Sequence, residues 1–73
     1  TPENNFDTIA EFWITYLNRA CVDEDGCVYI DATDVAMMMA LLKIARIAGG
    51  TGTRDSFIDL AGYAACGGEC ADV

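Results

Sequence analysis

Hydrophobic residues dominate one stretch near the middle of the chain. From Asp34 to Ala48 they occur on almost every side of a helix, and Lys43 and Arg46 are the interior charges. A helix that is apolar nearly all round must be covered on more than one side. The pattern therefore predicts a central helix over about residues 33–48, on which the other helices pack.

One further helix is predicted before the central helix and one after it. Over about residues 5–19, apolar residues recur at spacings of three and four, which is typical of a single buried stripe. Over about residues 54–67, an apolar side adjoins a side that carries aspartates. The first stripe consists of Phe6, Ile9, Trp13, Tyr16 and Leu17, and the last apolar side of Phe57, Leu60, Ala61 and Ala64.

Capping residues and glycines mark the ends of these helices. Asp31 or Thr33 can cap the central helix, and Gly49-Gly50 ends it by supplying left-handed backbone. Thr53 can cap the last helix.

Two further predictions concern the glycines within the last helix and at its end. Gly62 costs a helix roughly 1 kcal/mol relative to alanine, so its presence predicts close approach by another backbone or a ligand. The helix is expected to fray around Gly67-Gly68.

The length of 73 residues predicts one domain, residues 1–73, of marginal stability. A chain this short buries only about 60% of the surface that its unfolded form exposes. Because 53% of the residues are hydrophobic, we expect self-association, most simply a homodimer. The predicted fold is all-α: three main helices with a central antiparallel helical hairpin, packed as a dimeric helical bundle.

The formal net charge of −8 narrows the range of partners. It repels phosphate backbones and anionic lipids, which argues against direct nucleic-acid binding and against membrane binding. An acidic surface could still dock on a basic protein, or serve only to keep the protein soluble. No apolar run is long enough to cross a bilayer and nothing at the amino end resembles a signal peptide, so a cytoplasmic location is expected.

The sequence lacks the residues that several common kinds of active site and metal site require. With no histidine, no G-x-S-x-G and no phosphate loop of the G-x-x-x-x-G-K type, nucleophilic catalysis finds little support. The acidic loop Asp23-Glu24-Asp25-Gly26 misses two ligand positions of a helix-loop-helix calcium site. The four cysteines do not match zinc spacing and are expected to be free thiols, although Cys21 and Cys27 could close a disulfide under oxidising conditions.

A charged seam between the last two helices remains as the candidate site. If the chain folds back near position 51, Arg46 lies opposite Asp55 and Lys43 lies opposite Asp59. One interpretation is a structural ion network, because buried cations need partners. The other takes Asp55 and Asp59 as magnesium ligands, with Lys43 and Arg46 holding a phosphate. Trp13 is assigned to the core stripe or, alternatively, to the wall of a ligand pocket.

Three segments resemble a family of small, uncharacterised proteins encoded by tailed phages and prophages. The segments are Asn5-Phe6-x2-Ile9-Ala10-x-Phe12-Trp13, Ile30-x3-Asp34-Val35-Ala36-x-Met38-Met39-x-Leu41-Leu42-Lys43-Ile44-Ala45-Arg46 and Asp55-x-Phe57-Ile58-Asp59-Leu60-Ala61-Gly62-Tyr63-Ala64. The resemblance implies a phage protein that acts in the host cytoplasm. Members usually begin with an Arg-Gly and Tyr-Gly element, so an amino-terminal segment is expected to be missing.

More distantly, the helix pair is similar to the all-helical nucleoside triphosphate pyrophosphohydrolases of the MazG type. The resemblance implies dimers or tetramers and magnesium held by carboxylates from two adjacent helices. Asp55 and Asp59 match the second acidic pair of that pattern. The first pair is replaced by apolar residues, so this chain departs from the family there, and Glu11 is a candidate supplementary carboxylate.

The leading hypothesis is therefore a MazG-like protein that binds or hydrolyses nucleotides. Asp55 and Asp59 would be catalytic and would hold Mg²⁺, and Lys43, Arg46 and Trp13 would bind the substrate. The alternative hypothesis is a non-catalytic acidic phage accessory protein that binds and inhibits a host defence protein.

Overall fold

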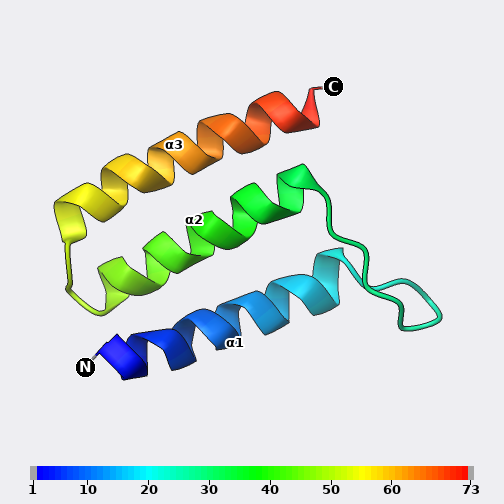
Figure 1. The fold of residues 1–73 in the computed structure, drawn as a ribbon, viewed down its shortest axis with the longest axis horizontal. Coiled ribbons are helices and arrows are strands. Elements are labelled where there is room, and N and C mark those ends of the chain that lie inside the picture. Colours follow the sequence, from blue (N-terminus) through cyan, green and yellow to red (C-terminus); the bar gives the residue numbers. More distant parts are fainter. Residues whose placement is uncertain (1, 73) are drawn as a thin grey trace.

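Three helices lie side by side in a single layer, with the central helix between the other two (Figure 1). The computed structural model describes residues 2–72, and the side chains of residues 5–72. The layer measures 37 × 27 × 12 Å, so it is one helix thick. The helices are α1 (Pro2–Ala20), α2 (Ala32–Ala48) and α3 (Thr53–Ala71).

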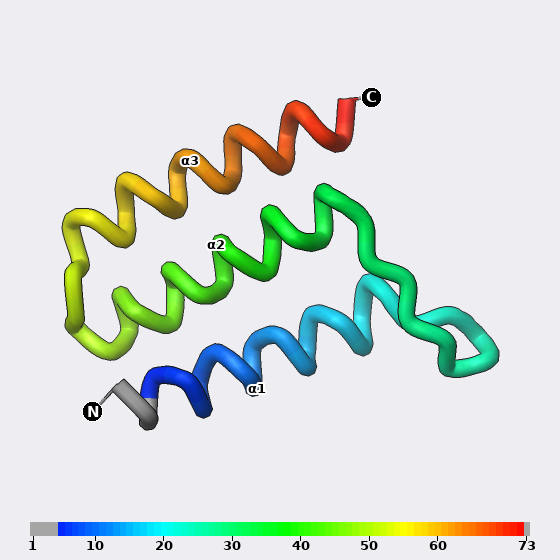
Figure 2. Tube along the Cα trace, in the orientation of Figure 1, coloured from blue at the N-terminus to red at the C-terminus, as the bar shows by residue number. Residues whose placement is uncertain are grey.

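The arrangement confirms the all-α class and the central antiparallel hairpin. Helix α2 contacts both neighbours, whereas α1 and α3 do not contact each other within residues 2–72 (Figure 2). The described part of the chain contains no strand, only an isolated bridge between Val22 and Val28 in the loop after α1. The expected packing of two chains as a bundle stays a prediction.

Helix α2 begins and ends at the residues that its sequence indicates. The Asp31 side chain accepts a hydrogen bond from the Asp34 amide, and the Asp34 carboxylate accepts one from the Asp31 amide, each at 3.0 Å. This capping box satisfies amides that would otherwise lack partners. At the other end, Gly50 adopts a φ of 76°, which is the left-handed backbone expected there.

Both outer helices are longer than the sequence predicts. Helix α1 begins at Pro2, a residue favoured in the first turn because its missing N–H needs no partner there. Helix α3 has Gly52 at its N-cap, with a φ of 59°, and no side-chain cap, so the predicted cap by Thr53 is wrong. Helix α3 also continues through Gly67 and Gly68 to Ala71.

The close approach of a backbone or ligand that was expected at Gly62 does not occur, whereas side chains of α2 lie close to Gly67. A Cβ added at Gly62 would meet nothing within 4 Å, whereas one added at Gly67 would lie 2.8 Å from the Met37 Cε and 3.4 Å from the Ala36 Cβ. Gly67 is buried against α2. Helix α3 continues for four residues beyond Gly67, so the predicted fraying around Gly67-Gly68 is wrong.

The buried stripe of α1 is narrower than predicted. Ile9 is buried, but the Phe6 side chain is 64% exposed. Asn5 turns toward α2 in its place, and its Nδ2 donates to the Ala45 carbonyl at 2.9 Å. Helix α1 contacts one helix only, so a stripe one or two residues wide covers the whole contact.

Helix α3 turns only Leu60 of its predicted apolar side toward α2. The contact is made by Ser56, which is 2% exposed, and by Gly67, with Leu60 half-buried between them. Small residues at both ends let the two helices approach closely. As a result the Phe57 side chain is 55% exposed and Ala64 is exposed as well.

Candidate functional site

A salt bridge joins α2 and α3 at the predicted seam. The Lys43 Nζ lies 3.0 Å from the Asp59 Oδ2. The Lys43 side chain is 18% exposed and that of Asp59 is 48% exposed. The long methylene stem of the lysine is therefore covered by the helices, while the charged ends remain accessible at the edge of the seam.

The second predicted pair, Arg46 with Asp55, does not form. The salt bridge at Lys43 is the only one among the residues that the structure describes. Asp55 precedes Asp59 by four residues, which rotates it about 40° further round α3, and Arg46 is rotated about 60° from Lys43. Both rotations lead away from the contact. Arg46 is half-buried and Asp55 is exposed, so the two side chains flank the salt bridge without joining it.

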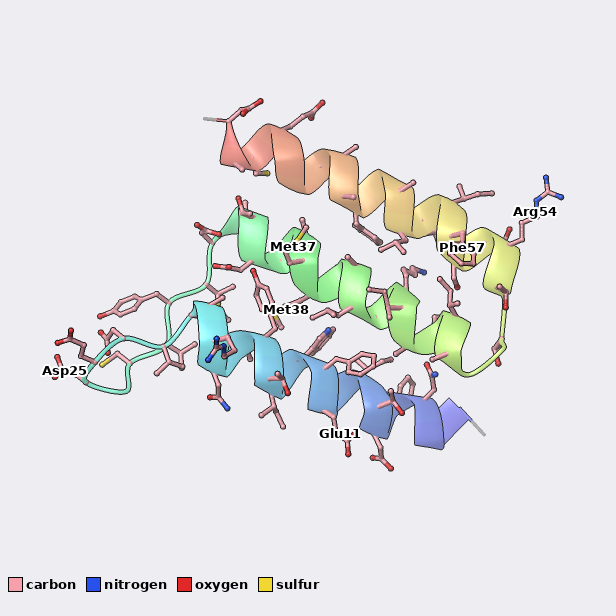
Figure 3. The ribbon with its side chains drawn as sticks, turned by 180° about the vertical axis from the view of Figure 1, so that it is seen from behind. Glu11, Asp25, Met37, Met38, Arg54 and Phe57 are labelled. Atoms are coloured by element: carbon pink, nitrogen blue, oxygen red, sulfur yellow. The ribbon has the colours of Figure 1, made fainter. Side chains whose placement is uncertain are left out.

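Trp13 lies on the other side of α2. It belongs to α1, and its Nε1 donates to the Met38 carbonyl at 2.6 Å. Since α1 does not contact α3 within the described residues, a single chain does not bring Trp13 to the seam. Glu11 is exposed on α1 and points away from α2, so it is not brought to Asp55 and Asp59 either (Figure 3).

A hydrogen-bonded cluster that the sequence does not predict lies between α1 and the start of α2. The Tyr16 hydroxyl donates to the Asp34 Oδ1 at 2.8 Å. The Cys21 thiol, which is buried, belongs to the same cluster and is influenced by the Asp34 carboxylate. Tyr16 falls in the helical stripe and Asp34 in a capping position, so neither pattern alone indicates that one carboxylate serves both helices.

The surroundings within this cluster shift the pKa values of Asp34, Tyr16 and Cys21. The Asp31 backbone amide, followed by the Tyr16 hydroxyl, holds the pKa of Asp34 below its usual range. Burial, followed by the hydrogen bond to Asp34, raises the pKa of Tyr16 to about 12. Burial and the same carboxylate raise the pKa of the Cys21 thiol. Each shift favours the state in which Asp34 is ionised and its neighbours keep their protons.

The free energy of unfolding is expected to fall at alkaline pH through Tyr16. Its pKa is 10.0 without the fold and about 12 within it, so its contribution is complete below pH 10 and is lost as the pH rises toward 12. Denaturant unfolding across this range should show a shallower loss for Tyr16→Phe than for the wild type. Cys21 is present in both proteins, so the titration of its thiol does not account for a difference between them. Equal slopes of the free energy of unfolding against pH in the two proteins would contradict the assignment of this loss to Tyr16.

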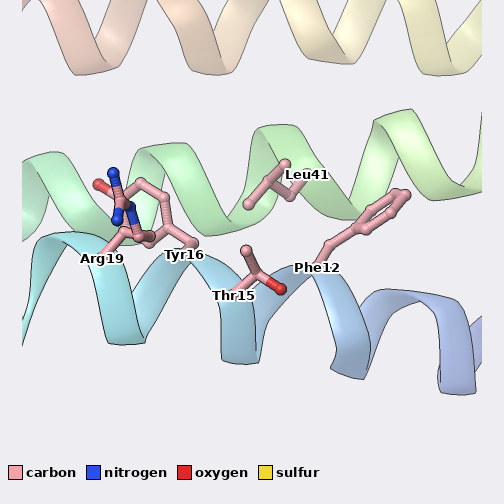
Figure 4. Close-up of a pocket in the computed structure, with 5 residues that line it drawn as sticks. All are labelled: Phe12, Thr15, Tyr16, Arg19 and Leu41. Atoms are coloured by element: carbon pink, nitrogen blue, oxygen red, sulfur yellow. The ribbon is translucent and has the colours of Figure 1, made fainter.

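A shallow groove of about 500 Å³ runs between α1 and α2 (Figure 4). Its lining is almost entirely apolar, with Arg19 at one end. The residues that line it are Phe12, Thr15, Tyr16, Arg19 and Leu41. A groove of this kind lacks the convergent polar groups of a catalytic pocket and suits an apolar contact.

The acidic loop before α2 is closed by its own hydrogen bonds. The Asp23 Oδ1 accepts from the amides of Asp25 and Cys27, both at 2.9 Å, so it stabilises the turn itself. Within the described residues, no three cysteine or acidic side chains gather to hold a metal ion. All four cysteines are free thiols in the structure. The loop does present three exposed apolar side chains, Val28, Tyr29 and Ile30.

The chain matches a known protein family and a phage protein. A family model described as a domain of unknown function, DUF6378, matches residues 1–71. The chain belongs to this family. It is 43% identical over 65 residues to the Gene 55 protein of Mycobacterium phage D29, a match that covers 89% of this chain and 37% of that protein. The expected resemblance to small phage proteins of uncharacterised function is therefore confirmed.

The match leaves most of the phage relative's length uncovered by the DUF6378 chain. The chain spans little more than a third of the length of its phage D29 relative. No solved structure matches it. Among the helices described, none combines the length and the apolar character needed to cross a membrane.

Proposed function

We propose that this DUF6378 chain binds nucleotide phosphates at the α2–α3 seam, in the manner of a MazG-like nucleotide-binding or pyrophosphohydrolase-like protein. The observation that carries the proposal is the contact at 3.0 Å between Lys43 and Asp59. It holds an ammonium group at the accessible edge of the seam, with its stem covered by the helices. Arg46 flanks this group on α2 and supplies a second cation for a phosphate.

The residues at the seam fit a magnesium ion that is shared with a substrate. Asp55 and Asp59 are exposed, one helical turn apart on α3, and they would hold the ion. Magnesium is commonly bound through one or two protein carboxylates together with phosphates and water, so a third carboxylate is not required. When bound, the ion would neutralise phosphate charge and lower the pKa of a bound water.

Asp59 has two roles in this proposal. Its carboxylate positions Lys43, and the 48% exposure of its side chain leaves it accessible to a metal ion. Trp13 lies across α2 from this site, so a single chain gives it no part in the binding of substrate. A role for Trp13 in substrate binding would require a second copy.

A panel of common nucleoside triphosphates with Mg²⁺ tests the proposal. We expect at least one to raise the melting temperature and to release pyrophosphate. Asp59→Asn should lower that release about tenfold or more while retaining helicity, because an exposed carboxylate is not needed for folding. Glu69→Gln is the matched control, since Glu69 is an exposed acid near the other end of α3. Equal loss in both variants, or no response to any nucleotide, would reject the proposal.

A second candidate is a non-catalytic acidic accessory protein that binds a basic host protein. It is favoured by the loop, where Tyr29 and Ile30 are 67% and 49% exposed beside Asp23, Glu24 and Asp25. Exposed aromatic residues within a field of one charge are typical of a docking element. Failure of the nucleotide panel, together with salt-sensitive capture of a host protein that Tyr29→Ser abolishes, would favour this candidate. Both candidates act in the host cytoplasm.

A further inference from the structure

One face of the three-helix layer is apolar across all three helices. We call it the apolar face and define it by Phe12 of α1, Met37, Leu41 and Ile44 of α2, and Phe57 of α3. Phe12 and Leu41 line the same groove, and Met37 and Phe57 lie on the side of the layer that Figure 3 presents. The register that joins Lys43 to Asp59 also sets Ile44 opposite Phe57.

Acidic residues are turned away from the apolar face. Asp55 and Asp59 stand two positions on either side of Phe57, which places them roughly 200° round α3, on the opposite face. Asp34 points toward Tyr16 of α1, and Glu11 points outward from the edge of the layer. Among the side chains that the structure describes, these carboxylates lie off the apolar face, so two copies of a chain of net charge −8 can meet there with little repulsion.

The exposed area of the chain exceeds that of a compact monomer of the same mass. Its accessible surface is 5086 Å² at 7.8 kDa. A compact monomer of that mass exposes roughly 4,400 Å², which leaves an excess of about 700 Å². A standard interface buries about 800 Å² on each partner. The excess therefore matches what one copy buries in a stable dimer.

The thickness of the layer likewise favours a second copy as the partner of the apolar face. Stable domains have at least two layers of secondary structure around one core, and this chain supplies a single layer. Its completely or nearly buried hydrophobic residues are mostly small, and Phe57 and Ile44 are 55% and 40% exposed. We propose that a second copy of this chain covers the apolar face, related by two-fold symmetry, so that two layers enclose the core that one layer lacks. The two Lys43–Asp59 seams then face outward on opposite sides.

Sedimentation velocity of the wild type and three glutamate variants tests this proposal. The wild type should be a dimer, and Ile44→Glu, at the centre of the apolar face, should raise the dimer dissociation constant about a hundredfold. Two matched controls should remain dimeric. Ile58→Glu places the charge on the outer edge of α3, where Ile58 is 61% exposed. Val35→Glu places it on the opposite face, because nine residues from Ile44 is two and a half helical turns.

Circular dichroism separates loss of the dimer from loss of the fold. If Ile44→Glu loses its helicity, the milder Ile44→Ser should keep it and still weaken the dimer about tenfold, while Ile58→Ser should not. A monomeric wild type overturns the proposal. Dissociation by Val35→Glu in place of Ile44→Glu also overturns it, because the interface would then lie on the face of the seam. Neither readout depends on nucleotide binding.

Discussion

Trp13→Ala is expected to detach α1 from the rest of the chain. The half-buried indole packs between α1 and α2, and its Nε1 donates to the Met38 carbonyl. Removing a large aromatic side chain from a packed contact costs about 3 kcal/mol. A chain of 73 residues has a total stability of roughly 4–11 kcal/mol, so this loss is a large part of it. Thermal unfolding followed by circular dichroism should show a lower melting temperature and lower helicity.

Trp13→Phe separates the hydrogen bond from the packing. It keeps an aromatic ring and removes the indole N–H, so the expected loss is about 1 kcal/mol. Phe6→Ala is the matched control, because Phe6 is an aromatic residue of the same helix whose side chain is 64% exposed. It should change the melting temperature of a single chain little. A fully folded Trp13→Ala would reassign this residue from the core to a binding role, the alternative that the sequence leaves open.

Gly67→Leu is expected to separate α3 from α2. Even a Cβ at this position would lie 2.8 Å from the Met37 Cε and 3.4 Å from the Ala36 Cβ, and a leucine adds three further carbon atoms to the same space. Overpacking of this kind costs about 1–3 kcal/mol. The free energy of unfolding, measured by denaturant titration, should fall by about the upper end of that range.

Gly62→Leu is the matched control for the glycine substitution. A Cβ at Gly62 meets nothing within 4 Å, and leucine is a better helix former than glycine by nearly 1 kcal/mol. The control should therefore stabilise the protein, so the two variants should move in opposite directions. A stabilising Gly67→Leu would show that α3 does not approach α2 at this glycine.

The sequence determined the parts of this protein that depend on local pattern. The apolar run in α2 indicated a helix covered on two sides, and the Asp31 and Gly49-Gly50 signals marked its ends. Helical spacing and the short turn together predicted the register that brings Lys43 to Asp59. These features follow from periodicity and capping chemistry, which are written in neighbouring residues.

Only the tertiary structure decided which side of each outer helix faces α2. The size of side chains made that choice for α3: Ser56 and Gly67 allow a closer approach than Phe57, so most of the predicted apolar side stays exposed. The same choice rotated Asp55 away from Arg46. The sharing of Asp34 between Tyr16 and its own capping box also depends on how α1 packs. Periodicity names the faces of a helix, but packing distance selects among them, because close contact favours small residues as well as apolar ones.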